Sequence, residues 1–433
     1  MMQYKQVLSQ QSSVFLNLVR LTAAELVVLG HYITKYQPAA PYDDLFRLGS
    51  TMGGAAVLLF FTLSGLLISL SLFSKLDQPN SNYGFRSYFI DRFSRIYSGL
   101  IPALILSAVI AALIYATNYS YYAELTTMQT APSALTFTMT ALMLDRFPVE
   151  FFNSLLSGWG LTFPLPQITP FGFNGILWTL VVDWWIYMFF GWITIGALAF
   201  VGKRQKTTLF KIGFFVVALL LSLVLAGLFL EYSGLVIAWF LGTLITLALS
   251  SEKLRTKLQK SSIKQMLTLL LPICLVATAF AVYTTFAWTS QFYDPTLGLT
   301  LSLCVFLTVL LLNIGSLKPV AKLLQSKLSQ KVVANGAGFS YTLFLTHYPI
   351  IIFLNGLDLE VNRFVMLLLI MLLTNIFAYS IALFTEKKHR QLAVSIKKKL
   401  HLPPYPQSSN DNMWQNPPQA IPSCHWRRRN VSV

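Results

Sequence analysis

"VFLNLVRLTAAELVVLGHYIT", residues 14–34, is an apolar run with the length of a bilayer-spanning helix. It nevertheless contains Arg20, Glu25 and His31. A charged side chain near the bilayer centre costs on the order of 3 kcal/mol, so such residues usually face the interior of a helix bundle or a water-filled cavity. The stretch therefore predicts a membrane helix with a polar side turned toward other helices.

The composition extends this prediction to the whole chain. Of its 433 residues, 55% are hydrophobic and 11% are charged, and the mean hydropathy is +0.61. A soluble domain carries about 25% charged residues. These values exclude an ordinary soluble protein and predict an all-α integral membrane protein with many spans in contact with the lipid bilayer.

Apolar runs long enough to cross a bilayer recur along the chain, and we expect about ten transmembrane helices. The expected spans are 14–34, 53–74, 96–117, 176–200, 212–231, 233–250, 266–288, 296–314, 338–356 and 364–385.

The net charge of +16 is concentrated in alternate connections between these spans. Lysines and arginines cluster at 75–95, 203–211, 253–264, 318–331 and 387–399. The positive-inside rule places those connections, and with them both termini, in the cytoplasm. Topology thus explains the charge, and we expect no nucleic-acid partner.

One further apolar run, "SALTFTMTALML" at 133–144, does not fit this alternation. It is too short to span the bilayer core, and a crossing there would move Lys203 and every later basic cluster to the outside. We therefore expect residues 118–173 to form an external excursion between the third and fourth spans. Its short apolar run would be re-entrant or interfacial.

The expected regions are a cytoplasmic N-terminus (1–13), a membrane domain (14–386) and a C-terminal tail (387–433). The tail is first basic and then rich in Pro, Asn and Gln, which is typical of disorder. The three cysteines, Cys274, Cys304 and Cys424, have no metal-ligand spacing, so we expect no metal.

Arg20 and His31 are eleven positions apart, which places them about 20° apart around an ideal helix and about 16 Å apart in depth. Glu25 points about 140° away from Arg20, so we expect it to be a partner for a polar group on another helix. Two structural alternatives stay open. Arg20 can extend toward the membrane surface as an interfacial residue, and His31 can be a buried imidazole that only supports the fold.

Polar residues also occur in the next two spans. Ser64 and Gly65 lie in the middle of the second span, where small residues indicate either close helix packing or function. Arg92 and Arg95 share a helix face at the cytoplasmic start of the third span. Guanidinium groups in that position suit phosphate groups, which they bind bidentately, although they can also be positive-inside anchors.

A second set of polar residues lies in later spans. Asp183 is a carboxylate within the fourth span, with Trp178 and Tyr187 on either side of it along the chain. The neighbouring Trp184 and Trp185 are typical of an interfacial aromatic belt. The ninth span contains three further candidates: Ser340, Tyr341 and His347.

In their order along the chain, these segments resemble the membrane acyltransferase family 3, a group of cell-envelope O-acetyltransferases. The resemblance covers about residues 14–386. It rests on an arginine, ten residues and a histidine (Arg20 to His31); an FFxxSG segment (Phe60, Phe61, Ser64, Gly65); an RxxRIY segment (Arg92, Arg95, Ile96, Tyr97); an NxxLWxL segment ending in tyrosine (Asn174, Leu177, Trp178, Leu180, Tyr187); and an SY segment ending in histidine (Ser340, Tyr341, Leu345, His347).

The resemblance implies a bacterial inner-membrane enzyme that transfers an acyl group, expected to be acetyl, from cytoplasmic acyl-CoA to an envelope glycan or glycolipid. His31 would be the general base. Arg20 and Asp183 would be catalytic, and Arg92 with Arg95 would bind the phosphates of CoA. The remaining candidates would contact substrate or support these groups: Ser64, Trp178, Tyr187, Ser340, Tyr341 and His347.

The chain departs from the family pattern at several positions. Asp183 replaces a glutamate, Thr179 a serine, Ser98 a proline and Phe344 a tyrosine, while Glu25 occupies an apolar site. The alternative to an acyltransferase is a secondary transporter or flippase. It would relay protons through Glu25, His31, Asp183 and His347. Such proteins are commonly built from internal repeats, and the sequence shows none.

Overall fold

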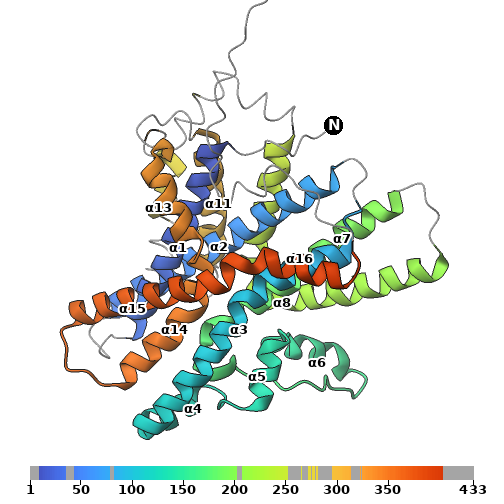
Figure 1. Cartoon of the computed structure of the whole chain (residues 1–433). Coiled ribbons are helices and arrows are strands. Elements are labelled where there is room, and N and C mark those ends of the chain that lie inside the picture. The colour runs from blue at the N-terminus through green and yellow to red at the C-terminus, as the bar shows by residue number, and fades with distance from the viewer. Residues whose placement is uncertain are drawn as a thin grey trace, which may run out of the picture.

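The computed structural model describes residues 9–35, 43–78, 82–201, 207–251, 295–313 and 324–402, together with isolated residues between 265 and 280 and at 322. Every regular element in these ranges is a helix (Figure 1). In chain order the elements are α1 (Gln10–Lys35), α2 (Asp43–Leu76), α3 (Phe85–Thr117), α4 (Tyr119–Met128), α5 (Ala134–Ala141), α6 (Val149–Ser157), η2 (Phe171–Phe173), η3 (Gly175–Leu177), α7 (Trp178–Val201), α8 (Thr208–Ser250), α11 (Pro295–Asn313), α13 (Lys327–Ala337), α14 (Ser340–Gly356), α15 (Arg363–Phe384), η4 (Glu386–Lys388) and α16 (His389–Lys399).

Within the described residues, six helices are long and apolar enough to cross a membrane. A seventh span results if α13 and α14, which meet at a bend of 52°, are counted as one. The ten expected spans are therefore not confirmed. The span expected at 266–288 lies almost entirely outside the described residues. At the span expected at 296–314, the apolar part of the helix is Thr300–Leu311, which is too short to count as a span.

Helix α8 accounts for two of the expected spans. Its 43 residues would extend about 65 Å if straight, roughly twice the hydrocarbon thickness of a bilayer. The backbone leaves the helical region at Tyr232 (φ −134°, ψ 43°). This break falls between the spans expected at 212–231 and 233–250, and it turns the helix within the bundle (Figure 1).

The excursion at 118–173 contains only short helices. α4, α5 and α6 have 10, 8 and 9 residues, too few to span a bilayer. Ser133 begins α5 with a capping box to Thr136, which fixes its start. Gly172 (φ 69°) brings η2 against α3, where a Cβ would lie 2.6 Å from Cβ of Ser107. The segment at 133–144 therefore contains no spanning helix, and its re-entrant placement stays a prediction.

Helix α2 packs along both α1 and α8 at the centre of the bundle. Small residues allow this approach: a Cβ on Gly65 would lie 1.8 Å from the carbonyl oxygen of Trp239, and one on Gly242 would lie 2.1 Å from that of Thr62. The packing interpretation of the Ser64–Gly65 pair thus holds for Gly65.

The outer surface of the bundle is apolar. Large hydrophobic side chains are exposed along α3, α8 and α15, among them Ile105, Leu220 and Phe364. A continuous surface of this kind would be an aggregation hazard in water. Together with the length of the helices, it makes this chain a multi-pass membrane protein.

The segment after residue 386, expected to be a basic stretch leading into a tail, folds onto the bundle. Glu386 starts η4, and α16 follows directly and packs across α3 (Figure 1). Ala393 and Lys397 of α16 are buried. The sequence did not indicate this packing, because the lysines and arginines there match an ordinary cytoplasmic anchor. Residues 403–433 lie outside the described residues.

Candidate functional site

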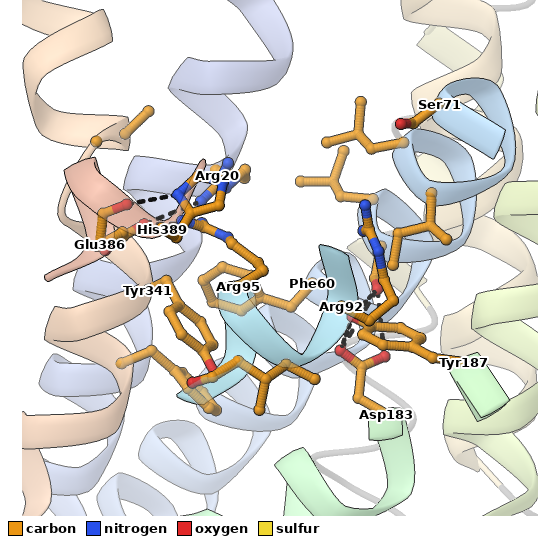
Figure 2. A pocket seen from close by; sticks show the side chains of 18 of the residues that line it. Arg20, Phe60, Ser71, Arg92, Arg95, Asp183, Tyr187, Tyr341, Glu386 and His389 are labelled. Atoms are coloured by element: carbon orange, nitrogen blue, oxygen red, sulfur yellow. Dashed lines mark hydrogen bonds and ion pairs between the residues drawn. The ribbon is translucent and has the colours of Figure 1, made fainter. Parts of the chain in front are cut away.

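Two cavities that contain ionisable side chains lie at successive depths along the same helices. The first, here called the arginine cavity, has a volume of about 540 Å³ and is lined by Arg20, Arg92, Arg95, Asp183, Tyr341 and Glu386, among others (Figure 2). The second, here called the histidine cavity, has a volume of about 960 Å³ and is lined by His31, Trp178, Glu231 and Tyr232, among others. Helix α1 contributes Arg20 to one cavity and His31 to the other, about 16 Å further along its axis.

The wall between the cavities is thin. Val57, Thr179 and Phe344 line both of them. These residues come from α2, α7 and α14, three helices that run past both cavities. A ligand that reaches the inner end of the arginine cavity is therefore one side chain away from the histidine cavity.

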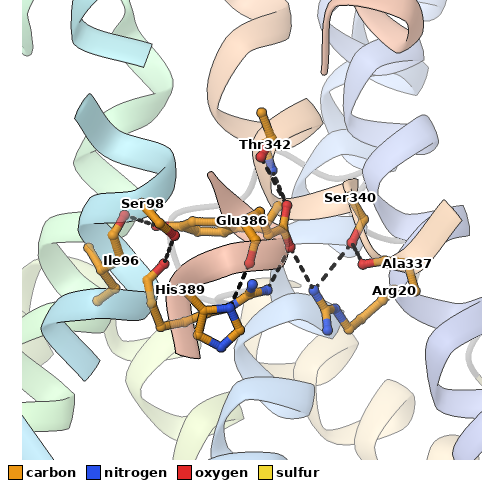
Figure 3. A network of polar contacts seen from close by, with 10 residues as sticks. Arg20, Ile96, Ser98, Ala337, Ser340, Thr342, Glu386 and His389 are labelled. Atoms are coloured by element: carbon orange, nitrogen blue, oxygen red, sulfur yellow. Dashed lines mark hydrogen bonds and ion pairs between the residues drawn. The ribbon is translucent and has the colours of Figure 1, made fainter. Parts of the chain in front are cut away.

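Glu386 organises the arginine cavity (Figure 3). Its side chain is 2% exposed. The Oε1 atom accepts a hydrogen bond of 2.7 Å from Arg95 Nη2 and lies 3.8 Å from Arg20 Nη2. The Oε2 atom accepts from the backbone N–H and the hydroxyl of Thr342, at 3.0 and 2.9 Å. One carboxylate thus holds two guanidinium groups from helices distant in sequence.

Two residues of the ninth expected span complete this arrangement. Ser340 accepts a hydrogen bond of 3.3 Å from Arg20 Nη2. The ring of Tyr341 lies under the Arg95 guanidinium, at 5.1 Å, and its hydroxyl donates to the carbonyl of Ile96. Both arginines are therefore held from two sides, so that their positions are set before any ligand binds.

The arginine cavity has an excess of positive charge. Six basic side chains and three carboxylates line it, namely Arg20, Lys75, Arg92, Arg95, Lys387 and Arg390 against Asp91, Asp183 and Glu386. Within the described residues, no carboxylate lies within ion-pair distance of Arg92, whose guanidinium packs over the ring of Tyr88 at 5.7 Å. Such a cavity suits a ligand with several phosphate groups.

A hydrogen-bonded group around Asp183 closes the inner side of the arginine cavity (Figure 2). The hydroxyl of Ser64 donates to Asp183 Oδ1 at 3.2 Å. The hydroxyl of Tyr187 donates to the same carboxylate, and it lies 2.6 Å from the Ser64 hydroxyl. Trp239 Nε1 donates to Ser64 at 3.3 Å. Asp183 thus lies in the arginine cavity, and in the described residues no hydrogen bond joins it to His31.

His31 pairs instead with His347. Its Nδ1 atom lies 3.0 Å from Nε2 of His347, and Nδ1 of His347 lies 3.0 Å from the carbonyl oxygen of Leu343. A carbonyl can only accept, so Nδ1 of neutral His347 carries the proton and its Nε2 accepts from His31. The proton of neutral His31 is then on Nδ1. Its Nε2 atom keeps a lone pair in a residue that lines the histidine cavity.

Part of the wall of the histidine cavity is formed where α8 breaks. Tyr232 stacks on Trp178 with ring centroids 4.8 Å apart and planes at 27°. Glu231 and Ser233 flank Tyr232 and also line the cavity. Irregular backbone in a membrane helix is tolerated where it borders a polar cavity. The break therefore presents an aromatic face beside a carboxylate and a hydroxyl.

Comparison with known families settles the class of this protein. A sequence model of the acyltransferase 3 family, described as an acyltransferase domain, matches residues 13–383. The chain belongs to this family. No curated relative and no solved structure gives a significant match.

The predicted site residues of this acyltransferase fall into the two cavities. Seven line the arginine cavity: Arg20, Ser64, Arg92, Arg95, Asp183, Tyr187 and Tyr341. Two line the histidine cavity: His31 and Trp178. Ser340 and His347 stand behind them, as partners of Arg20 and His31.

The acyltransferase also has cavity residues that the sequence did not single out. Glu386, His389 and Arg390 line the arginine cavity, and Glu231 and Tyr232 line the histidine cavity. Glu386 is the acidic residue in "TEKKHR" at 385–390, and this sign change within a basic cluster was the available signal. Glu231 follows directly on an apolar run of α8, and an acidic residue in that position is also a signal that the sequence contains.

Glu25 has a separate role in the acyltransferase. Asn375 Nδ2 of α15 donates a hydrogen bond of 3.2 Å to Glu25 Oε2. The prediction that Glu25 is a partner for a polar group on another helix is confirmed. Since Glu25 lines neither cavity, its contact joins α1 to α15.

Proposed function

We propose that this acyltransferase moves an acyl group, expected to be acetyl, from acyl-CoA to a hydroxyl of a cell-envelope glycan or glycolipid at the bacterial inner membrane. The observation that supports this proposal is the pair of cavities with a shared wall. One cavity suits a phosphate-bearing donor and the other contains a histidine with an available lone pair. Transfer needs the thioester to reach only the wall formed by Val57, Thr179 and Phe344.

The donor would enter the arginine cavity from the cytoplasm, where acyl-CoA is made. Arg92 is the better candidate for a direct phosphate contact, because Arg95 is already bound by Glu386. Arg20 shares that carboxylate and lies about 16 Å from the depth of His31. We therefore assign Arg20 to donor binding, and Asp183 to holding Ser64 and Tyr187 at the inner end of the donor cavity.

The reaction follows from the His31 tautomer. Nε2 of His31 takes the proton of the acceptor hydroxyl as its oxygen attacks the thioester carbonyl. The C–O bond forms, the C–S bond breaks, and the proton passes from His31 to the departing thiolate. His347 accepts the hydrogen bond from Nδ1 throughout, so it orients the imidazole and stabilises its protonated form.

The acceptor would occupy the histidine cavity. A sugar presents a C–H face and several hydroxyls, and the stacked Trp178 and Tyr232 offer an aromatic surface next to the Glu231 carboxylate. Thr34, Ser50 and Thr51 add hydroxyl groups to the lining of this cavity. Few polar groups placed around an aromatic surface are typical of sites that fix the orientation of one ligand.

The decisive experiment follows labelled acetyl-CoA in membranes that contain the protein. We expect the label to appear in the envelope glycan or glycolipid fraction as a base-labile ester, and to be absent with His31→Ala. A matched set of proteoliposomes measures uptake of the same label. Uptake without ester formation would reject the transferase and favour the secondary transporter or flippase.

A further inference from the structure

We infer that α16 is the closing element of the donor cavity: it supplies Arg390 to the phosphate groups of acyl-CoA, and a buried ion pair of Lys397 with Asp91 holds it in place. The inference rests on the proposed function, since it concerns how the same donor is bound. It assigns a binding role to a segment outside the residues matched by the family, 13–383.

The position of α16 supports this role. His389 and Arg390 in the first turn and Ala393 in the next line the arginine cavity. Ala393 is 2% exposed, because this face packs on α3. Nδ1 of His389 lies 2.6 Å from the carbonyl oxygen of Glu386 and therefore donates to it. The orientation of the His389 ring is thus tied to the residue that holds Arg95 and Arg20.

The ion pair is part of a buried cluster from three helices, α2, α3 and α16. Asp91 of α3 lies between two ammonium groups, with Lys75 Nζ 3.0 Å from Oδ2 and Lys397 Nζ 2.7 Å from Oδ1. The Tyr83 hydroxyl donates to Oδ2 at 2.6 Å. The Lys75, Asp91 and Lys397 side chains are all 5% exposed or less.

The role of this cluster is better explained by the positioning of helices than by a gain in the stability of the fold. Burying three charges costs several kcal/mol per ion, and apolar replacements of similar volume are often as stable. What the cluster adds is a fixed relation between the ends of α2 and α16 and the start of α3. Lys75 and Asp91 themselves line the donor cavity, so the contact that fixes α16 is part of the wall that the donor meets.

The outer face of α16 is suited to the membrane surface. Opposite the buried Ala393 and Lys397, the exposed side chains are polar or basic, namely Gln391, Ser395, Lys398 and Lys399, and the exposed Leu392 and Val394 flank them on either side. A basic helix face of this kind is attracted electrostatically to the surface of an anionic leaflet. α16 would then stand between the donor cavity and the cytoplasmic surface, across the path of an arriving acyl-CoA.

The test measures CoA affinity of the full-length protein in detergent micelles by isothermal titration. Lys397→Met keeps the length of the side chain and leaves Asp91 paired with Lys75, so no isolated charge is buried. If α16 must be closed for binding, the dissociation constant of CoA should rise at least about fivefold, because only the closed fraction binds. Lys398→Met, an exposed neighbour with the same chemical change, is the matched control and should bind CoA like the unaltered protein.

Arg390→Gln tests the phosphate contact without touching the ion pair. We expect weaker binding of CoA at an unchanged melting temperature, and unchanged acetyl transfer from S-acetyl-pantetheine, which lacks the phosphates. Unchanged CoA affinity in Arg390→Gln overturns the inference. This result decides the question even if Lys397→Met does not fold. Failure of the unaltered protein to bind CoA would instead contradict the proposed function.

Discussion

The Nδ1 atom of His31 lies 3.0 Å from the Nε2 atom of His347, although 316 positions separate the two residues in the chain. The contact joins α1 to α14 at the depth of the histidine cavity. Because His347 is bound to a backbone carbonyl on its other side, the pair has a defined direction. It leaves Nε2 of His31 as the basic atom.

The first prediction concerns His31. His31→Ala should lower transfer by at least about a hundredfold, the usual contribution of a general base. Acyl-CoA binding should stay largely intact, since His31 does not line the arginine cavity. Turnover and CoA titration on the same preparation measure both quantities. Near-normal turnover would transfer the catalytic role to His347.

The second prediction concerns His347 as a positioning residue. His347→Ala should lower kcat by about tenfold or more while the KM for acyl-CoA stays the same, because His31 loses its orientation and the donor does not. His347→Asn, whose amide oxygen can still accept from Nδ1 of His31, should recover part of the rate. A rise in the acyl-CoA KM alone would place His347 with the donor instead.

The third prediction separates the two arginines of α3. Arg92→Gln should raise the KM for acyl-CoA with little change in melting temperature. Arg95→Gln should lower the melting temperature as well, because the longer contact to Arg20 is then the only ion pair of the buried Glu386 among the described residues. Arg95→Lys should restore the function only in part, since an ammonium cannot reproduce the guanidinium fork. Unchanged acyl-CoA dependence of the Arg92, Arg95 double glutamine variant would reduce both residues to topology anchors.

The fourth prediction is topological. If the 118–173 excursion does not cross the membrane, reporter fusions at residues 125 and 168 both lie outside and a fusion at 206 lies inside. The short helices of this segment agree with that arrangement. Opposite results at 125 and 168 would show that the segment crosses and that the expected topology is wrong.

The fifth prediction uses Asp145, which lies in the same excursion outside the spanning helices. Burial raises the pKa of its carboxyl from 3.8 to about 6. Between about pH 4 and pH 6 the unfolded chain releases this proton while the folded chain retains it, so stability falls as the pH rises. Asp145→Asn should remove this dependence and stabilise the protein at pH 7.5 by up to about 3 kcal/mol. Melting temperatures at pH 5 and 7.5 measure the effect.

The exposed Glu124 of α4 provides the control for this experiment. Glu124→Gln removes one carboxylate from the same excursion and leaves Asp145 in place, so the variant should keep the pH dependence of the unaltered protein. Equal slopes for the Asp145→Asn variant and the unaltered protein would contradict the assignment to Asp145.

The membrane class, several of the helices and the break near 232 were predictable from the sequence alone. These features depend on local hydropathy, since a segment of about 20 apolar residues crosses lipid whatever its neighbours are. The same reasoning identified Arg20, His31, Asp183 and His347, because an ionisable group in an apolar run is visible without any knowledge of packing.

Only the tertiary structure decided how these groups are paired. Asp183 belongs with Ser64 and Tyr187, and His31 with His347. Glu386, 291 positions from Arg95, and the helix that follows it became part of the donor cavity. Such pairings depend on which helices pack together and on the rotation of each about its axis, and those are set by side-chain shape between segments far apart in the chain. Hydropathy is a property of one segment, so it reveals the polar group but not its partner.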